Sequence, residues 1–236
     1  MGNVYKLAEL LVEMECFGRT KEQAIPYLYD GNQKADFCVK GNIEGMKKRY
    51  PEITDDMAEY LSTGSDFYRQ LLNYNGLMLH SSAVVVEGRA YLFSAHSGTG
   101  KSTHTNLWLQ HFGERAYILN DDKPALRKMN GKWYAFGTPW SGKDDMSVNI
   151  GVELGGIAIL ERANQNEIAP YSGTSAIFDI FSQVNRPRAY ELREKLLSLL
   201  SQLIDDVPVW KLKCNIDREA VEIAYNAMSG VWRNKE

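Results

Sequence analysis

The sequence predicts a mixed α/β fold (α+β in its connections), in which helices pack on a mixed, partly antiparallel sheet. Strand-like and helix-like segments are interspersed, but without the strict alternation that an all-parallel sheet requires. Two pairs of short strand-like segments are each joined by a tight turn, which is typical of β-hairpins. The first hairpin runs directly into a glycine-rich segment, Ser97–Thr103, that opens a predicted helix.

The bulk composition is that of an ordinary globular protein. The chain has 236 residues, of which 44% are hydrophobic and 24% charged, and its net charge is −3. This length suits one large domain, or a domain with a smaller appendage, and we expect residues 1–75 to form an N-terminal α+β portion packed on a core of residues 76–236. Charges of both signs are interspersed and no apolar run is long enough to span a bilayer, so neither a nucleic-acid nor a membrane partner is predicted.

The cysteines and the start of the chain predict a cytoplasmic protein. Cys16, Cys38 and Cys214 are widely spaced and form no C-x-x-C pair, which fits buried free thiols in a reducing compartment. The first residues show no basic stretch followed by an apolar segment, and Lys6 stands where a myristoylation signal requires Ser or Thr.

The N-terminal region is predicted to contain two strands and one long helix. Residues 4–17 are apolar with poor periodicity, which favours a strand over a helix, and residues 35–40 read as a short strand between turns. Residues 55–73 have helical periodicity, although Gly64 weakens the middle of this helix.

The region around the glycine-rich segment predicts a mixed sheet. Residues 82–86 and 89–93 are rich in β-forming side chains and are joined by Glu87-Gly88, so they predict a hairpin. The helix over residues 101–112 follows the glycine-rich segment. The strand before that segment would therefore pair antiparallel with its predecessor, unlike the strand of an all-parallel sheet.

The rest of the chain also alternates irregularly between predicted strands and predicted helices. Asn130-Gly131 is a strong hairpin signal between residues 125–129 and 132–136, and a loop follows over residues 137–149. Asp217 is predicted to cap a last helix that Gly230 terminates. The remaining predictions are strands over 117–119, 157–160 and 209–214, and helices over 175–184 and 189–207.

The segment after the first hairpin has the residue types of a phosphate-binding loop. Glycines let consecutive backbone N–H groups converge on an anion, Lys101 adds a positive charge, and Ser102 offers a hydroxyl to Mg²⁺. Ala95 departs from the pattern G-x-x-x-x-G-K-[ST], which asks for glycine there. An ordinary turn is the alternative, but the strand–loop–helix context favours phosphate binding. The candidate residues are Ser97, Gly98, Thr99, Gly100, Lys101, Ser102 and Thr103.

Two adjacent carboxylates, Asp121 and Asp122, end the next predicted strand. A site that uses ATP needs a carboxylate to hold Mg²⁺, and a transferase needs a base for the proton of the attacking hydroxyl. Neighbouring like charges would raise one of the two pKa values, which suits a base. Asn-Asp-Asp is also good turn chemistry, so a solvated turn is the alternative. Beside an intact phosphate loop, the functional interpretation is favoured.

The histidines and tryptophans have a functional and a structural interpretation. His80 precedes the hairpin and is a candidate to approach the phosphates, although a histidine in an apolar stretch often serves structure. His96 lies in the loop, facing either a phosphate or solvent. His104 is predicted to be structural, and Trp108 and Trp133 to belong to the core rather than to stack on a base.

The loop over residues 137–149 is a candidate substrate loop or lid. It combines glycines with charge, and Lys143 is placed to meet a phosphate or an acidic acceptor. Trp140 belongs to the same candidate set, as does Arg162, a possible counter-charge after the strand at 157–160. The alternatives are a surface connection and a surface ion pair.

Taken together, these motifs resemble a known family. A hairpin, SGTGKST, a strand that ends in NDD and a glycine-rich segment are similar to the C-terminal domain of HPr kinase/phosphorylase and the wider phosphoenolpyruvate carboxykinase-like fold. The run from HSSAVVVEGRAYLFSAHSGTGKSTHTNLW through NDDKPAL to GTPWSGK resembles a group of uncharacterised bacterial HPr-kinase-like proteins over most of the chain. The similarity to characterised kinases covers residues from about 78 to 160.

The resemblance implies a Mg²⁺-dependent kinase that uses ATP or another nucleoside triphosphate. Ser97 to Ser102 would bind phosphates, Ser102 and Asp122 would serve the metal, and Asp121 would be the base, with Lys101 and His80 also in the catalytic set. The acceptor would be a hydroxyl of a small molecule, peptide or protein, and a homo-oligomer is possible by analogy. GTPWSGKDD stands where the HPr kinase signature is expected, so HPr is not predicted as the acceptor. A nucleotide-binding regulator without transfer chemistry and a carboxykinase-like lyase are the alternatives.

Overall fold

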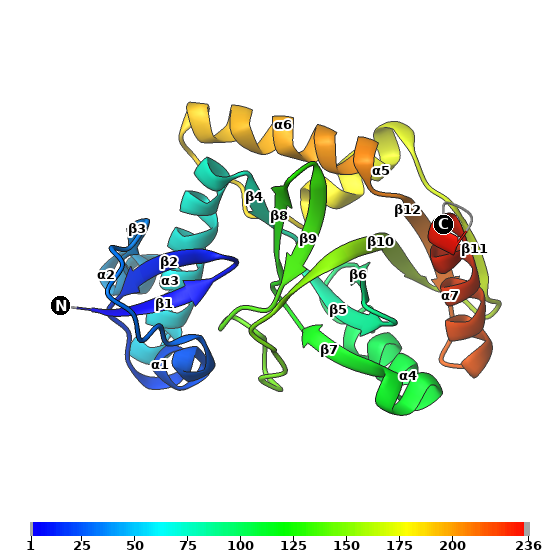
Figure 1. The fold of residues 1–236 in the computed structure, drawn as a ribbon, viewed down its shortest axis with the longest axis horizontal. Coiled ribbons are helices and arrows are strands. Elements are labelled where there is room, and N and C mark those ends of the chain that lie inside the picture. Colours follow the sequence, from blue (N-terminus) through cyan, green and yellow to red (C-terminus); the bar gives the residue numbers. More distant parts are fainter. Residues whose placement is uncertain (1, 234–236) are drawn as a thin grey trace.

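The computed structural model describes residues 2–233, which form two sheets surrounded by helices (Figure 1). The helices are α1 (Gly18–Ala24), α2 (Ile43–Arg49), α3 (Asp55–Leu71), α4 (Lys101–Phe112), α5 (Gly173–Ser182), α6 (Tyr190–Asp206) and α7 (Arg218–Arg233). The strands of the small sheet are β1 (Asn3–Leu7), β2 (Leu10–Met14) and β3 (Phe37–Val39). The strands of the large sheet are β4 (Gly76–Met78), β5 (Ser81–Val86), β6 (Arg89–Ser94), β7 (Ala116–Asn120), β8 (Ala125–Met129), β9 (Lys132–Phe136), β10 (Gly151–Arg162), β11 (Glu167–Pro170) and β12 (Val209–Cys214).

The small sheet is made by a hairpin and a third strand. β1 and β2 pair antiparallel, and Ala8 and Glu9 both have positive φ at their tight turn. β3 then adds to β2 in parallel. The strand predicted over residues 4–17 is therefore two strands, because a two-residue turn leaves almost no polar break in the sequence. The helices α1 and α2 were not predicted, since each has only 7 residues and too few turns to show periodicity.

The helix α3 joins the small sheet to the large one. Its first turn is capped by Thr54, whose hydroxyl accepts a hydrogen bond from the Met57 amide at 3.2 Å. Gly64 lies where a Cβ atom would come within 2.8 Å of the Trp140 ring, so glycine is required by this close approach. A shared apolar core contains side chains of β1, β2 and α3 together with Ala125, Phe136 and Trp140 of the large-sheet region.

The large sheet is mixed, as the sequence predicts. The strand order is β4-β8-β9-β10-β6-β5-β7, with β12 and then β11 attached to β10. β6 pairs antiparallel with β5 and parallel with β10, so the strand before the phosphate loop has both kinds of neighbour. The chain is thus a mixed α/β protein with hairpins at 81–94 and 125–136.

The strand β10 is longer than the predicted 157–160 because it serves both halves of the large sheet. Its first residues pair antiparallel with β9, and its later residues pair parallel with β6 and β12. A register shift between Leu154 and Gly156 marks the change. β10 therefore carries its last residues, up to Arg162, to the edge where β6 ends.

Helices cover both faces of the large sheet, which explains why every residue of β5 is buried. Trp108 of α4 and Ala220 of α7 pack on one face, and Ile180 of α5 and Leu199 of α6 pack on the other. In Figure 1, α6 runs above β8 and β9, and α4 lies on the opposite side near β5 and β7. Trp108 and Trp133 are 0% and 3% exposed, so both belong to the core as predicted.

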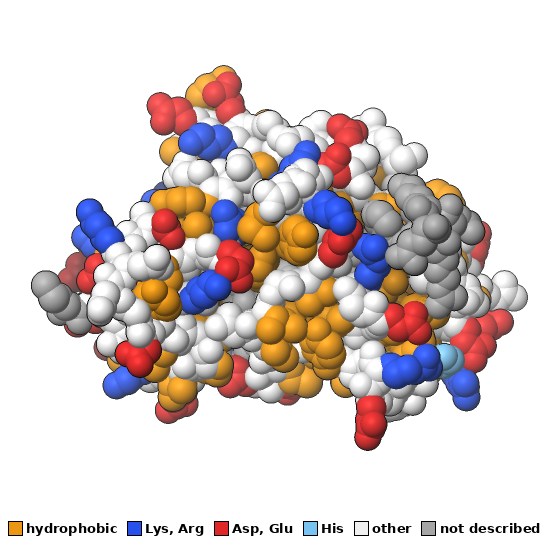
Figure 2. All heavy atoms as spheres, in the orientation of Figure 1, with side chains coloured by type: hydrophobic (Ala, Val, Ile, Leu, Met, Phe, Trp, Pro, Cys, Tyr) orange, Lys and Arg blue, Asp and Glu red, His pale blue; other side chains and the backbone are white. Residues whose placement is uncertain are grey.

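One predicted helix end is wrong. Gly230 lies inside α7, which continues to Arg233, because its φ is not in the left-handed region that ends a helix. The strands β4 and β11 were not predicted, since they have only 3 and 4 residues. Within residues 2–233, no helix combines the length and the apolar character needed to cross a membrane. On the face that Figure 2 shows, positive and negative side chains are interspersed without a single-sign patch.

Candidate functional site

The phosphate loop connects the end of β6 to the start of α4. Gly98 and Gly100 have φ values of 80° and 114°, a backbone conformation that only glycine adopts without strain. A Cβ atom at Gly98 would meet nothing within 4 Å, so glycine is needed there for its backbone angle and not for space. Ala95 is not among the described non-glycine residues with positive φ, which explains why alanine is tolerated at a position where the pattern asks for glycine.

Lys101, the first residue of α4, is held inside the loop. Its side chain is 8% exposed, and its Nζ donates a hydrogen bond to the Ala95 carbonyl at 3.1 Å. Burial lowers the pKa of Lys101, while the nearby carboxylates of Asp122 and Asp121 act in the opposite direction. The ammonium group is thus bound to the backbone at the start of the loop and lies near two acidic side chains.

Arg162, at the end of β10, holds the loop from outside. Its Nε donates to the Thr99 carbonyl at 2.9 Å, and its terminal nitrogen donates to the Gly98 carbonyl. Because these carbonyls are occupied from outside, the peptide groups of the loop keep a fixed orientation. The sequence predicted a counter-charge for a substrate at this position, and the structure brings Arg162 to the phosphate loop itself.

Asp121 lies on the side of the site that faces α4. Its Oδ1 accepts a hydrogen bond from the Ser82 hydroxyl at 2.6 Å, and the Ser102 hydroxyl also bonds to its carboxylate. The Ser82 hydroxyl is in turn 2.8 Å from that of Thr105 in α4. Burial raises the pKa of Asp121, with the hydrogen bonds from Ser82 and Ser102 opposing this effect. Ser102 and Asp121 therefore present two oxygen donors in one place.

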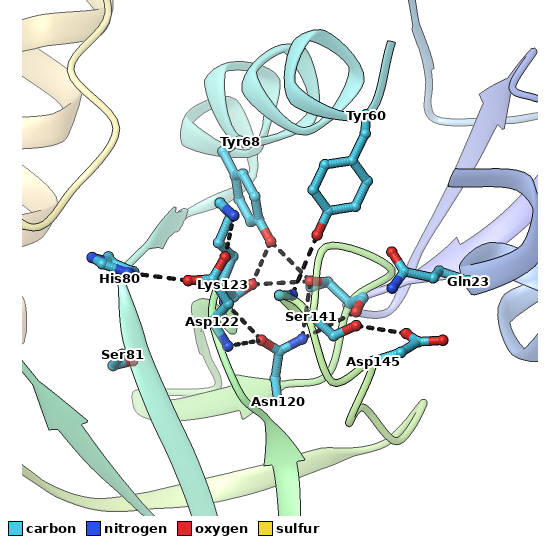
Figure 3. A network of polar contacts seen from close by, with 12 residues as sticks. Gln23, Tyr60, Tyr68, His80, Ser81, Asn120, Asp122, Lys123, Ser141 and Asp145 are labelled. Carbon is cyan, nitrogen blue, oxygen red and sulfur yellow. Dashed lines mark hydrogen bonds and ion pairs between the residues drawn. The ribbon is translucent and has the colours of Figure 1, made fainter. Parts of the chain in front are cut away.

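Asp122 lies in different surroundings, as Figure 3 shows. Its Oδ1 is 3.1 Å from His80 Nε2, and its other oxygen contacts the Lys123 ammonium. Burial alone would raise the pKa of Asp122, but the hydrogen bond from His80 and the charge of Lys123 lower it to about 2. His80 Nδ1 lies 3.1 Å from Gln183 Oε1, so the end of α5 helps to orient the ring. In Figure 3, the side chains of His80 and Asp122 point toward one another.

Asn120 organises the turn that separates the two carboxylates. Its Oδ1 accepts from the backbone amides of Asp122 and Lys123 at 3.0 and 2.7 Å, and its Nδ2 donates to the Thr138 carbonyl at 3.0 Å. The side chain is fully buried. The Asn-Asp-Asp sequence indicates such a turn, but the contact of the Asn120 side chain with Thr138 depends on the tertiary structure.

The loop over residues 137–149 is attached to the N-terminal region. Trp140 is 1% exposed, stacks on Phe67 of α3 at 5.0 Å between ring centroids, and donates to the Thr63 hydroxyl at 3.3 Å. The Gly142 amide donates to the Tyr60 hydroxyl at 3.3 Å. Trp140 thus anchors the loop to α3, whereas Lys143 is exposed at the loop tip. Residues of α3 hold this loop next to the Asp121–Asp122 turn (Figure 3).

Two cavities flank the phosphate loop. The first has a volume of about 450 Å³ and lies between the start of the loop and α5, where Asp179, Gln183 and Lys211 contribute to its wall. The second has a volume of about 270 Å³ and lies between the start of α4 and the ends of β10 and β12. Thr99 and Arg162 border both cavities. We call them the α5-side cavity and the α4-side cavity.

The donor set of this site fits a phosphate-bound magnesium ion better than a metal held by protein alone. Among residues 2–233, no three or more His, Cys, Asp or Glu side chains gather in the manner of an all-protein metal site. Mg²⁺ is commonly held by one or two protein oxygens together with phosphate oxygens and water. The Ser102 hydroxyl and the Asp121 carboxylate supply such oxygens beside the phosphate loop.

Comparisons with known proteins give a match to a family model and distant likenesses to solved structures. The family model described as SynChlorMet cassette protein ScmC matches residues 52–223. No curated protein matches the chain. Among solved structures, the HPr(Ser) kinase/phosphatase from Coxiella burnetii is similar at 12% identity and a TM-score of 0.37, covering 67% of this chain and 99% of that one. This likeness concerns the fold alone, and no functional argument rests on it.

Proposed function

The chain belongs to the SynChlorMet cassette protein ScmC family, and from this premise we propose that it is an ATP- and Mg²⁺-dependent phosphotransferase acting on a hydroxyl group. One observation carries the proposal: the phosphate loop with Lys101 and Ser102 lies within hydrogen-bonding reach of a carboxylate from the Asp121–Asp122 pair. Phosphate binding, metal binding and proton acceptance are the three tasks that phosphoryl transfer needs.

The phosphate loop would hold the triphosphate. Its backbone N–H groups, the start of α4 and the Lys101 ammonium offset the negative charge of the phosphates. Arg162 supports this role indirectly, because it holds the Gly98 and Thr99 carbonyls away from the anion. Mg²⁺, when bound beside Ser102 and Asp121, would neutralise charge on the transferred phosphoryl group.

The contacts favour a division of labour between the carboxylates that is the reverse of the one the family resemblance implies. Asp121 bonds to the Ser102 hydroxyl, so we assign Asp121 to the metal. Asp122 bonds to His80 instead, so we assign Asp122 to the acceptor proton and His80 to the positioning of that carboxylate. The low pKa of Asp122 makes it a weak base, so in this assignment the proton reaches it late, after most of the phosphorus–oxygen bond has broken in a loose transition state.

The transfer step is then a single in-line displacement. The acceptor oxygen forms a bond to the γ-phosphorus, the bond from that phosphorus to the bridging oxygen breaks, and ADP leaves with the electron pair. The acceptor proton passes to the Asp122 carboxylate. Lys101 and the loop amides stabilise the charge that develops on the phosphoryl oxygens.

The α5-side cavity is the proposed place of the acceptor. Gln183 contributes to its wall and contacts His80, which connects the cavity to Asp122. Lys211 lies there 3.4 Å from Asp179 and 3.5 Å from Glu161. A volume of about 450 Å³ with charged groups of both signs suits a small polar molecule or a side chain of a peptide.

Labelled ATP tests this function directly. Purified protein with γ-labelled ATP and Mg²⁺ is incubated with a metabolite pool and a peptide pool, beside Lys101→Ala, Asp121→Asn and Asp122→Asn. We expect an acceptor that is labelled by the unsubstituted protein and by none of the three variants. Equal labelling by all four proteins would trace the signal to a contaminant, and binding of ATP without any labelled acceptor would contradict transfer.

A nucleotide-binding regulator is a second candidate function, because the Asp122 carboxylate is already bound by His80 and Lys123. A carboxylate held in this way is stabilised in its ionised form, which disfavours proton acceptance. The regulator predicts that Asp122→Asn binds ATP normally and keeps its biological function. The kinase predicts normal binding with loss of function.

A further inference from the structure

The α4-side cavity takes no part in the proposed transfer, yet it lies directly beside the phosphate loop. Thr103 and His104 of α4 form one wall, and Ala163 and Ile216, which follow β10 and β12, form the other. β6, β10 and β12 are parallel, so their carboxyl ends meet at this edge of the sheet. In sheets of this kind, ligands bind in the crevice outside the carboxyl ends of the strands.

The lining of this cavity is mainly apolar. Leu107, Leu160 and Ile216 line it, together with the Cys214 thiol, and Ile216 is 73% exposed at its rim. Glu161 and Arg162 border both cavities, whereas the charged groups Lys211 and Asp179 line the α5-side cavity alone. A flat, largely apolar group therefore fits the α4-side cavity better than a phosphate or a carboxylate does.

His104 adds one buried hydrogen-bond donor to this wall. Its side chain is 3% exposed, and its Nε2 accepts a hydrogen bond from Trp108 Nε1 at 3.1 Å. Burial lowers the pKa of His104 to about 4, so the ring is neutral at pH 7 and its proton is on Nδ1. This Nδ1 is buried and has no hydrogen-bond partner among the described residues. Because Nδ1 is closed off from water, this donor lies inside the wall and does not open into the cavity.

The orientation of a bound nucleotide follows from the positions of the two cavities on opposite sides of the loop. The γ-phosphate must lie near Asp122 and His80, where the acceptor approaches from the α5-side cavity. The α-phosphate and the nucleoside then extend away from that end, past Ser102 toward Thr103. The α4-side cavity begins at Thr103.

We infer that the α4-side cavity binds the base of the nucleotide and prefers a purine. This inference rests on the proposed function, since it needs a triphosphate in the loop. Apolar contact grows with area, so a bicyclic purine gains more from Leu107 and Ile216 than a pyrimidine does.

The test compares the affinity of the protein for nucleoside triphosphates with its affinity for tripolyphosphate, which has no base. Calorimetry in Mg²⁺ compares ATP, GTP, CTP, UTP and inorganic tripolyphosphate on the unsubstituted protein. The double variant L107A/I216A removes apolar contacts at positions that are partly or largely exposed, so it is expected to fold. A matched control, I177A/L197A, removes the same two side-chain types at the exposed groove between α5 and α6. Thermal unfolding of both variants checks that they are folded.

We expect L107A/I216A to weaken purine triphosphates about tenfold, the effect of losing several buried methylene contacts, and to leave tripolyphosphate unchanged. The control should bind every ligand as the unsubstituted protein does. Equal effects of the two double variants, or equal affinities for purine and pyrimidine triphosphates, would overturn the base site while the proposed function stands. Failure of every triphosphate to bind, or binding that survives Lys101→Ala, would overturn both.

Discussion

The α5-side cavity and the α4-side cavity share the phosphate loop but differ in character. Lys211 and Asp179 line the first alone, Glu161 and Arg162 border both, and the rest of the second is mainly apolar. The difference begins in one strand: Ile159 of β10 belongs to the core under α5 and α6, and Leu160 to the core under α4 and α7. A strand alternates its side chains between faces, so neighbouring residues can serve two different ligand groups.

Under the proposed function, this contrast between the cavities corresponds to the two ends of the nucleotide. A nucleoside triphosphate has a reactive, charged end and a flat, apolar end, and the loop lies where these two ends would part. Arg162 borders both cavities and holds two loop carbonyls, so it connects them. The predictions below test whether each side of the loop serves only its own end of the nucleotide.

The largest expected effect separates Asp121 from Asp122. Asp122→Asn should lower the rate of phosphoryl transfer by about 10³-fold, the scale of a lost general base, with little change in nucleotide affinity. Asp121→Asn should instead remove the dependence of nucleotide affinity on Mg²⁺. Transfer assays and calorimetry with and without Mg²⁺ measure the two effects. Exchange of the two outcomes would restore the roles that the family resemblance implies.

Lys101→Ala should weaken every ligand of the loop. The loss of one buried charged contact to phosphate is expected to lower affinity about 100-fold, for tripolyphosphate as well as for ATP. Calorimetry with both ligands provides the measurement. Lys213→Ala, which removes an exposed lysine paired with Glu167, is the control for loss of charge and should change neither affinity. A loss confined to ATP would show that Lys101 serves the base side instead.

The ionised state of Asp122 should contribute to stability in a defined pH window. Its pKa is about 2 in the folded protein and is near its ordinary value in the unfolded chain, so its contribution is complete above about pH 4. As pH falls through the folded pKa this contribution, about 2 kcal/mol, is lost. Denaturant unfolding should therefore show Asp122→Asn less stable at pH 6 and equally stable at pH 2. A constant difference at all pH values would contradict the ion-pair explanation.

The smallest effect is expected at Arg162. Arg162→Gln removes the guanidinium group whose two hydrogen bonds hold the Gly98 and Thr99 carbonyls. Without these bonds the free loop is less ordered, so nucleotide binding must also order it. We expect ATP and tripolyphosphate to weaken by a similar factor of about five, since rigid loops avoid this ordering cost. Calorimetry of both ligands tests it. If the substitution changed only the preference for purine over pyrimidine triphosphates, Arg162 would belong to the base site and would not act by supporting the loop.

Local elements could be predicted from the sequence because their signals lie close together in the chain. The bounds of α4, β8, β9 and β12 agree with the residues predicted, and the first hairpin agrees within one residue. The glycines, Lys101 and Ser102 of the phosphate loop stand within a few residues, so their chemistry is visible without any tertiary contact. The end of α7 was wrong because a glycine terminates a helix only where it adopts a positive φ.

What the sequence determined by itself is the glycine-rich loop that opens α4, the hairpin before it and the presence of two carboxylates after the next strand. The tertiary structure alone decided which carboxylate faces Ser102, that His80 contacts Asp122, and that Trp140 is an anchor for α3. It also separated the polar cavity from the apolar one. The physical reason is that a loop's chemistry depends on backbone conformation over a few residues, whereas these contacts depend on the order of strands and on which face each side chain takes.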